Sequence, residues 1–295
     1  MRLTFNTIRD GLDAINTANE QFASAQWQVS SGHRLRTSSD DPLAAQSAVN
    51  DQAEIGTLDS YSRASDSAIS RLAMLDSVLG DVVDKITQAL TAAQSARGSS
   101  VTPSGRAAAS GMLTSIRDSI AGDINTTFNG NFLFSGSMTA TKPYVQAAGV
   151  WTYQGDAVAV TLAVDRSRSV TLATSGQAIL QGGDSTDVLS ALDALATAAA
   201  SGDAAGLNAG MDALSRAFRR AVDAQGHVGT EQQNVSDGQT QLATLRLASI
   251  ARLSKDQDAN AVEAIARMNQ AQISYQAALG AVGTASKVSL LDYIR

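Results

Sequence analysis

The sequence predicts a mainly α-helical protein with a small β insertion, in which the N- and C-terminal segments form a long antiparallel coiled-coil helical rod. Apolar residues alternate in steps of three and four at both ends of the chain, which is the pattern of a coiled-coil seam. The chain has only three prolines, so long helices can run without interruption. Period-two alternation is confined to residues 140–183, and this predicts a few strands there.

The composition favours helices in close contact. The 295 residues leave room for two or three domains. Hydrophobic residues make up 44% but aromatic residues only 4%, so the predicted seams are thin and rich in Ala. A net charge of -6 argues against a nucleic-acid-binding surface, which needs a basic patch. Since no apolar run reaches about 18 residues, we also expect no membrane insertion.

The chain contains no cysteine, which excludes disulfides, thiolate metal sites and a cysteine nucleophile. No apolar segment with a small-residue cleavage site follows Arg2, so we expect no cleaved signal peptide. Taken alone, this start would suggest a cytoplasmic protein.

The first predicted helix, residues 1–31, has two rows on one side. One row recurs every seven residues, and the other lies four residues after it: Met1, Ile8, Ile15, Phe22 and Val29, then Phe5, Leu12, Asn19 and Gln26. The remaining positions are mostly uncharged, whereas an exposed helix face usually carries Lys and Glu. We therefore expect this helix to be covered on several sides by distant segments or other chains. Its predicted assembly interface is Ile8, Leu12, Ile15, Phe22 and Val29.

A loop and a second long helix should follow. Gly32 can end the first helix in the left-handed conformation, and Asp41 followed by Pro42 is typical of an N-cap and first helical position. Asp40 and Asp41 could instead form an acid–base pair or ligate a metal, but capping explains their position. The second helix is predicted over residues 42–97.

After a turn at 98–105, a third helix is predicted over residues 106–128, with Met112, Ile116, Ile120 and Ile124 on one face. A turn and a short strand follow, where we place a domain junction at Phe132, Phe134 and Gly136. Alternating residues before and after a turn at 165–168 predict a hairpin. The small core of the insertion, residues 140–183, is expected to contain Tyr144, Trp151 and Tyr153.

Helical periodicity returns at residue 185, with breaks at 201–203 and 256–260. The last helix has no formal charge from Met268 to Ser286. This character matches the first helix, so we expect the two ends to pair. The stripe on the last helix is Ile265, Met268, Ala271, Gln272, Tyr275, Ala278, Leu279 and Val282. The predicted assembly residues of this segment are Met268, Tyr275, Leu279, Val282, Leu290 and Leu291.

The sequence offers no residues for catalysis or a cofactor. It contains no phosphate-binding loop and no Gly-x-Ser-x-Gly elbow. His33 and His227 lack neighbours at metal-ligand spacing. Arg216, Arg219 and Arg220 form a basic cluster, which we expect to be a solvated or salt-bridged helix face.

Three stretches together resemble the bacterial flagellar axial proteins of the flagellin-like superfamily. They are Ser31-Gly32-His33-Arg34-Leu35 with Ser39-Asp40-Asp41-Pro42-Leu43-Ala44-Ala45, Phe132-Leu133-Phe134-Ser135-Gly136-Ser137 with Pro143-Tyr144 and Tyr153-Gln154-Gly155-Asp156, and Ser289-Leu290-Leu291-Asp292-Tyr293-Ile294. The second stretch is most similar to the hook-associated protein 3 family of hook–filament junction proteins. The family loop motif corresponds to Ser31, Gly32, Arg34, Asp40, Asp41 and Pro42, with His33 where Lys is common.

The resemblance implies nested domains and an extracellular place in the flagellum. Residues 1–40 with 256–295 would form an inner assembly domain, 41–139 with 184–255 a helical middle domain, and 140–183 an outer insertion. The resemblance also implies export through the flagellar type III apparatus without a cleaved signal, and an export chaperone on the C-terminal helix. This replaces the cytoplasmic expectation.

The expected function is therefore structural and not enzymatic. The resemblance implies a hook–filament junction subunit that assembles into a ring and contacts other hook-associated protein and flagellin subunits. A flagellin-type filament subunit is one alternative. A secreted adhesin or binding protein that acts through residues 140–183 is another.

Overall fold

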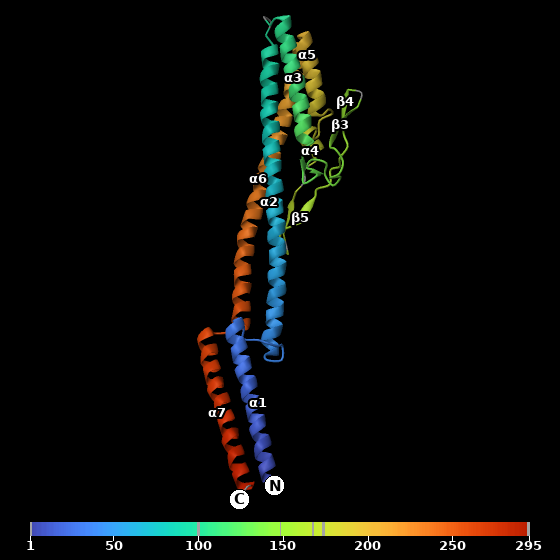
Figure 1. Cartoon of the computed structure of the whole chain (residues 1–295). Helices are drawn as coiled ribbons and strands as arrows, with labels where there is room; N and C mark the ends of the chain where they lie inside the picture. The colour runs from blue at the N-terminus through green and yellow to red at the C-terminus, as the bar shows by residue number, and fades with distance from the viewer. Residues whose placement is uncertain (1, 99–100, 148, 167, 173–174, 294–295) are drawn as a thin grey trace. The chain divides into compact units, whose positions relative to one another are not determined.

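The computed structural model describes residues 2–98, 101–147, 149–166, 168–172 and 175–293, with the backbone alone for 2–8 and 285–293. Helices dominate, and short strands are inserted between the third and fourth helices (Figure 1). The chain divides into two compact units. Unit 1 is Met1–Asp59 with Thr244–Arg295, and unit 2 is Ser60–Ala243. The mainly α-helical fold with small antiparallel strand pairs is as predicted.

In unit 1, α1 (Arg2–Ser31) packs antiparallel against α7 (Ala261–Tyr293). The Phe22 ring stacks on the Tyr275 ring with centroids 6.4 Å apart and planes 5° from parallel. A Cβ added at Gly11 would lie 2.7 Å from a Val282 methyl carbon, so the helices approach closely there. The expectation that the two ends of the chain pair is confirmed.

Two further helices contribute their ends to unit 1. These are the start of α2 (Pro42–Ala96) and the end of α6 (Ala204–Gln257). Arg246 Nε lies 2.6 Å from an Asp59 carboxylate oxygen. Arg252 bridges Asp51 at 3.0 Å and Glu54 at 3.1 Å. Because Asp51 is only 8% exposed, the Arg252 pair provides the opposite charge that a buried carboxylate needs.

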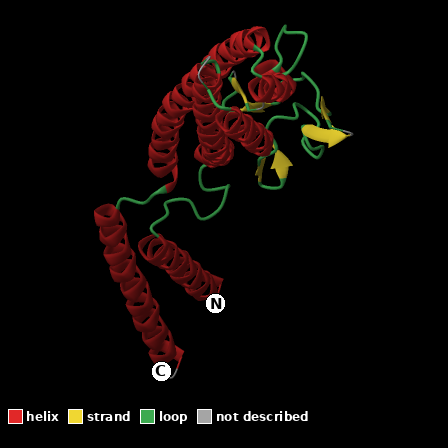
Figure 2. Cartoon of the chain, turned by 90° about the horizontal axis from the view of Figure 1, so that it is seen from above, coloured by secondary structure: helices red, strands yellow, loops and turns green. Residues whose placement is uncertain are grey.

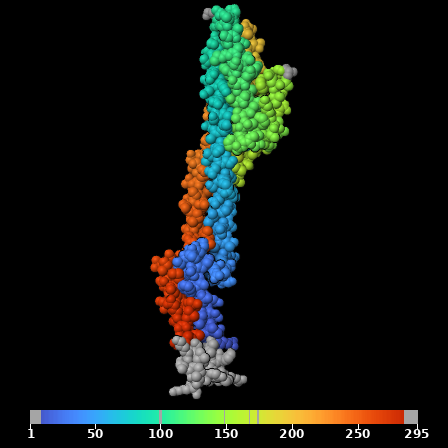
Figure 3. Space-filling model, in the orientation of Figure 1, coloured from blue at the N-terminus to red at the C-terminus, as the bar shows by residue number. Residues whose placement is uncertain are grey.

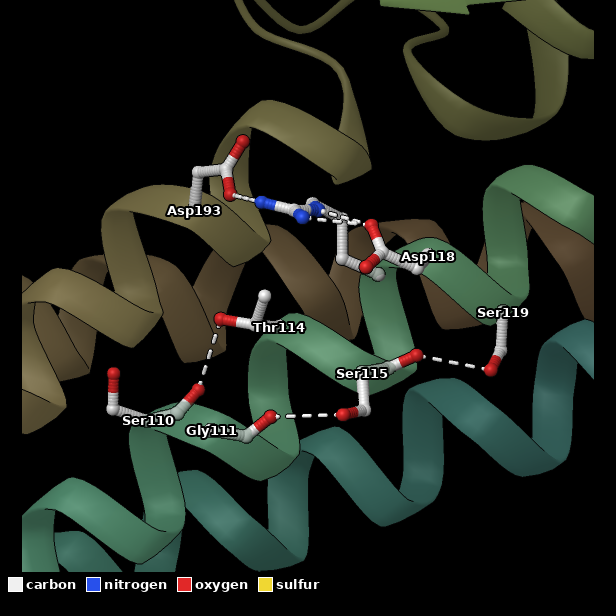
Figure 4. A network of polar contacts seen from close by, with 8 residues as sticks. Ser110, Gly111, Thr114, Ser115, Asp118, Ser119 and Asp193 are labelled. Atoms are coloured by element: carbon white, nitrogen blue, oxygen red, sulfur yellow. Dashed lines mark hydrogen bonds and ion pairs between the residues drawn. The ribbon is translucent and has the colours of Figure 1, made fainter. Parts of the chain in front are cut away.

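Unit 2 holds the main hydrophobic core, which is built by the rest of α2 and α6 with α3 (Pro103–Ile124) and α5 (Val188–Ser201). Thr102 caps α3 by accepting a hydrogen bond from the Gly105 amide at 3.2 Å. Arg117 of α3 pairs with Asp193 of α5 and with Asp118 on its own helix (Figure 4). Hydroxyls on the same helix, such as that of Thr114, donate to carbonyls four residues earlier (Figure 4).

Among the residues that the structure describes, six short strands form three antiparallel pairs, each two strands wide (Figure 2). They are β1 (Thr127–Phe128) with β2 (Asn131–Phe132), β3 (Tyr144–Ala147) with β4 (Val150–Tyr153), and β5 (Thr161–Ala163) with β6 (Ser169–Thr171). The short helix α4 (Gly176–Leu180) follows. Figure 3 shows this insertion, in yellow-green, gathered against the helices of unit 2.

Three predictions about local structure need correction or extension. The helix predicted over 106–128 begins at Pro103 and ends at Ile124. Met112 was placed on one face with Ile116, Ile120 and Ile124 but is 48% exposed, whereas Leu113 is fully buried, because the buried row reaches Ile116 through Ala109 and Leu113. The β5–β6 hairpin is confirmed, while the β3–β4 hairpin was not predicted.

The predicted junction around Phe134 ties the first strands to the rest of the insertion. Phe134 is fully buried, Phe132 is half-buried, and the backbone at Gly136 has a φ of +67°. The Phe134 carbonyl accepts hydrogen bonds from the Tyr153 hydroxyl and the Gly176 amide, both at 2.8 Å. The Asp156 carboxylate accepts the Ser137 amide at 2.7 Å and the Val158 amide at 3.1 Å.

We expect Gly136→Ala to destabilise unit 2 by about 2 kcal/mol, because φ is positive and the added carbon would overlap Asp156. Gly111→Ala is the matched control, since Gly111 lies inside α3 with open space around it. The control should stabilise the protein by up to about 1 kcal/mol. Denaturant unfolding and hydrogen exchange of the β3–β4 amides measure both effects. Equal stability of the two variants would contradict the assigned junction geometry.

Candidate assembly surface

The residues predicted for assembly on α1 divide into two groups. Ile15 and Phe22 are half-buried against α7. Leu12 is 52% exposed and Val29 is 37% exposed. The side chain of Ile8 lies outside the described residues. The helix therefore uses part of its predicted seam within the chain and leaves part of it open.

The second row predicted on α1 does not face α7 within the chain. Leu12, Asn19 and Gln26 are all exposed. The residues that accompany Ile15 and Phe22 toward α7 are instead Gly11, Ala18 and Ala25, the last two being 8% and 7% exposed. Small side chains let two helices approach closely, and this approach decides which row meets the partner.

On α7, Met268, Tyr275 and Val282 are half-buried on the side of α1, while Leu279 is 45% exposed. The side chains of Leu290 and Leu291 lie outside the described residues. Val262, which sequence reasoning missed, is 79% exposed. The sequence could have indicated this position, because Val262 is a large aliphatic residue in the first turn of α7. The Asn260 side chain caps this turn by accepting the Val262 amide at 3.1 Å.

Unit 1 carries most of the large apolar side chains that stay exposed in the described part of the chain. They are Leu12, Val29, Leu43, Val49, Leu245, Leu247, Val262, Ile265, Ile273 and Leu279. Single exposed apolar residues are ordinary, but a concentration of them in one small unit indicates an interaction surface.

The loop after α1 binds to the linker between α6 and α7. Gly32 ends α1 with a φ of +73°, as predicted. The Gly32 carbonyl accepts the Ala259 amide at 2.8 Å, and the Arg34 amide donates to the Gln257 carbonyl at 2.7 Å. The Arg34 guanidinium donates to the Asp256 carbonyl at 2.9 Å and to the Asp41 carboxylate at 3.2 Å. His33 forms an isolated antiparallel β-bridge with Asp258 of the same linker.

Asp41 caps α2, and Asp40 closes the turn before it. Asp41 Oδ1 accepts the Ala44 amide at 3.1 Å, while Asp40 Oδ2 accepts the Arg36 and Thr37 amides at 2.9 Å. The Ala44 amide and then Arg34 lower the pKa of Asp41. The Thr37 and Arg36 amides lower the pKa of Asp40. Pro42 occupies the first position of α2. The capping interpretation is confirmed.

Other polar groups have structural partners. Arg216 and Arg220 pair with Asp184 at 2.9 Å and 2.8 Å, so this part of the basic cluster is salt-bridged as expected. Across the described residues, no three His, Asp or Glu side chains gather into a metal-binding group. Within those residues, no helix has an apolar stretch long enough to cross a bilayer.

An open groove of about 580 Å³ runs between α1 and α7. Most of its lining residues are polar and uncharged, while Glu20 and Arg267 carry charge. The residues are Thr17, Glu20, Gln21, Ser24, Ala25 and Gln28 from α1, and Arg267, Gln270, Ala271 and Ser274 from α7.

We expect Asp41→Ala to loosen the start of α2, because it removes the helix cap and the carboxylate that pairs with Arg34. The measurement is hydrogen exchange of the Ala44 amide, which should become several-fold faster. Asp41→Asn is the control, since Asn still caps a helix but carries no charge. If both variants exchange equally fast, the charge pair rather than the cap holds the loop.

Acidification should reproduce part of this effect. A carboxyl whose pKa is lowered in the folded state stabilises the fold above its unfolded pKa, and this contribution is lost as the pH falls through the folded pKa. The loop contacts of Asp40 and Asp41 should therefore persist at neutral pH and open only in strong acid. Loss of Ala44 protection near neutral pH would contradict this assignment.

Comparisons with known proteins place these features in a family context. Residues 10–139 match the bacterial flagellin N-terminal helical region. The flagellar hook-associated protein 3 of Salmonella typhimurium is 29% identical over 169 residues, which cover 57% of this chain and 53% of that protein. The Escherichia coli protein of the same name is 30% identical over 161 residues, covering 52% and 50%. The chain thus spans about half the length of the curated relatives that it matches.

Solved structures share the fold. A putative flagellar hook-associated protein from Vibrio parahaemolyticus has a TM-score of 0.71 at 22% identity, covering 74% of this chain and all of that one, 100%. FlgL from Xanthomonas campestris has a TM-score of 0.63 at 16% identity, covering 69% and 99%. The resemblance indicated by the sequence motifs is confirmed: this chain is similar to flagellar hook-associated protein 3, and residues 10–139 match the bacterial flagellin N-terminal helical region.

Proposed function

We propose that this chain is a structural subunit of the bacterial flagellum, a hook–filament junction protein that adapts the hook to the filament. The observation that carries the proposal is the concentration of exposed apolar residues in unit 1, in a homologue of hook-associated protein 3. A soluble monomer gains no stability from leaving Leu12, Val262 and Ile273 in water. A subunit that buries these side chains against neighbouring chains gains hydrophobic free energy from the burial.

The partners follow from the same surface. Copies of this chain assemble into a ring, and the ring contacts other hook-associated protein and flagellin subunits. The assembled protein is extracellular and reaches its place through the flagellar type III export apparatus. Before assembly, an export chaperone covers the apolar C-terminal helix. The pairing of α1 with α7 supports this proposal, because it presents both termini in one assembly domain.

Deleting the gene in its own bacterium should abolish motility while flagellin is still made and secreted. The physical reason is that filament subunits would lack the surface on which they assemble. Electron microscopy of the cells and immunoblots of the medium measure the outcome. The full-length gene supplied in trans should restore attached filaments.

Two outcomes favour other functions. Normal hooks with filaments still attached, together with lost surface binding, would indicate an adhesin that acts through residues 140–183. Long filaments formed by the purified chain alone would indicate a flagellin-type subunit. An enzyme role has no residues to support it among those described.

We expect Phe22→Asp to prevent incorporation into flagella while unit 2 melts as in the wild type. The buried charge would separate α1 from α7, where Phe22 stacks on Tyr275. Ile15→Asp should behave in the same way. Phe22→Leu is the control, because it keeps an apolar contact. Incorporation is measured on isolated flagella, and unit 2 unfolding by hydrogen exchange. If Phe22→Asp also unfolds unit 2, α1 belongs to a common core instead.

A further inference from the structure

The α1–α7 pair has one contact row on each helix, and this row defines two further faces. The rows are Gly11, Ile15, Ala18, Phe22 and Ala25 on α1, and Ala264, Met268, Ala271, Tyr275, Ala278 and Val282 on α7. One residue step turns about 100° around a helix. Since the two helices are antiparallel, the same step along each helix leads to the same side of the pair.

Residues one step after each contact row form what we call the amide face. They are Leu12, Asn16, Asn19, Ala23 and Gln26 on α1, and Ile265, Asn269, Gln272, Gln276 and Leu279 on α7. All are exposed and none is charged. A solvent-facing side of two helices normally carries Lys and Glu. A face made only of amide and apolar groups is instead suited to burial against another protein.

Residues one step before each contact row form what we call the groove face. The groove of about 580 Å³ is lined by Thr17, Gln21 and Ser24 of α1 and by Arg267, Gln270 and Ser274 of α7, all one step before the row, together with Glu20, Gln28 and the contact-row residues Ala25 and Ala271. That one groove collects these residues from both helices confirms the symmetry of the pair. The amide face and the groove face therefore lie on opposite sides.

The two faces complement each other in shape and chemistry. The amide face carries the larger side chains Leu12, Ile265 and Leu279, whereas the groove face carries the small residues Ala14, Ala277 and Ala281. Both faces present side-chain amides, which donate and accept hydrogen bonds at once. On the groove side Arg267 pairs with Glu263 at 3.3 Å, and Asp10 and Glu20 are exposed carboxylates.

We infer that the amide face of one copy docks into the groove face of a second copy of this chain. This inference rests on the proposed function and adds the direction of assembly to it. Contact between two amide faces would leave the groove unfilled and set bulky residues against each other. Docking between unlike faces is heterologous, so every copy keeps one free face and recruits the next. Such an interface generates a ring or a helical array rather than a closed dimer.

The natural absence of cysteine permits a direct test by cross-linking. Asn19→Cys places a thiol on the amide face, and Gln21→Cys places one on the groove face. The two full-length variants are expressed separately or together, and isolated flagella are treated with a short bis-maleimide. We expect cross-linked dimers in the mixture and only the wild-type background in either variant alone. Asp13→Cys mixed with Gln21→Cys is the matched control, because Asp13 lies on neither face, and it should give no dimer.

Two results would overturn the inference. Dimers from Asn19→Cys alone would mean that amide faces meet each other, and flagella that contain both variants but give no dimer would mean that the faces do not meet. If the chain is absent from flagella, the proposed function fails separately. The same mixture is then cross-linked as concentrated purified protein, where dimers still support the inference and their absence overturns it.

Discussion

Pairing of segments from opposite ends of the chain is the constraint on which unit 1 depends. Arg252 and its partner Asp51 are 201 positions apart in sequence. The loop that leaves α1 and the linker that enters α7 are joined through the Gly32 carbonyl and the Arg34 amide. These bonds hold the start of α2 beside the end of α6 within the unit. If the pairing is lost, α1 is a single helix with an apolar row and no partner, and it loses the tertiary packing from which most helical stability in proteins comes.

The three-four spacing of apolar residues predicted the existence and length of α1 and α2 and the existence of α7, but not which row meets the partner. Hydrophobicity marks the bulky residues, so Leu12 was placed beside Ile15 in one seam. The chain instead brings the small residues Gly11, Ala18 and Ala25 to α7. Distance of approach is a property of two helices together. A pattern in one helix therefore cannot fix it.

The strands were the least predictable elements for a related reason. Residues that form β3 and β4 lack a clean alternation, and a two-stranded pair has little stability of its own. Its anchor is tertiary, since Tyr144 is only 1% exposed and its amide donates to the Asn125 side chain at 2.9 Å. The motif around Phe134 indicated a junction without giving its geometry. The capping role of Asp41, by contrast, is a local rule and was predictable in full.

The energetics of a small-residue seam explain why the open faces matter. Hydrophobic stabilisation is about 0.8 kcal/mol for each buried methylene group, and Gly and Ala contribute few such groups. The small residues between α1 and α7 therefore let the helices approach closely but bury little apolar area. The bulkier groups Leu12, Ile265 and Leu279 stay outside it, 52%, 46% and 45% exposed. Ordering so many residues opposes pairing. In the proposed assembly, burial of these outer groups against a neighbouring copy adds to the free energy that holds the pair together.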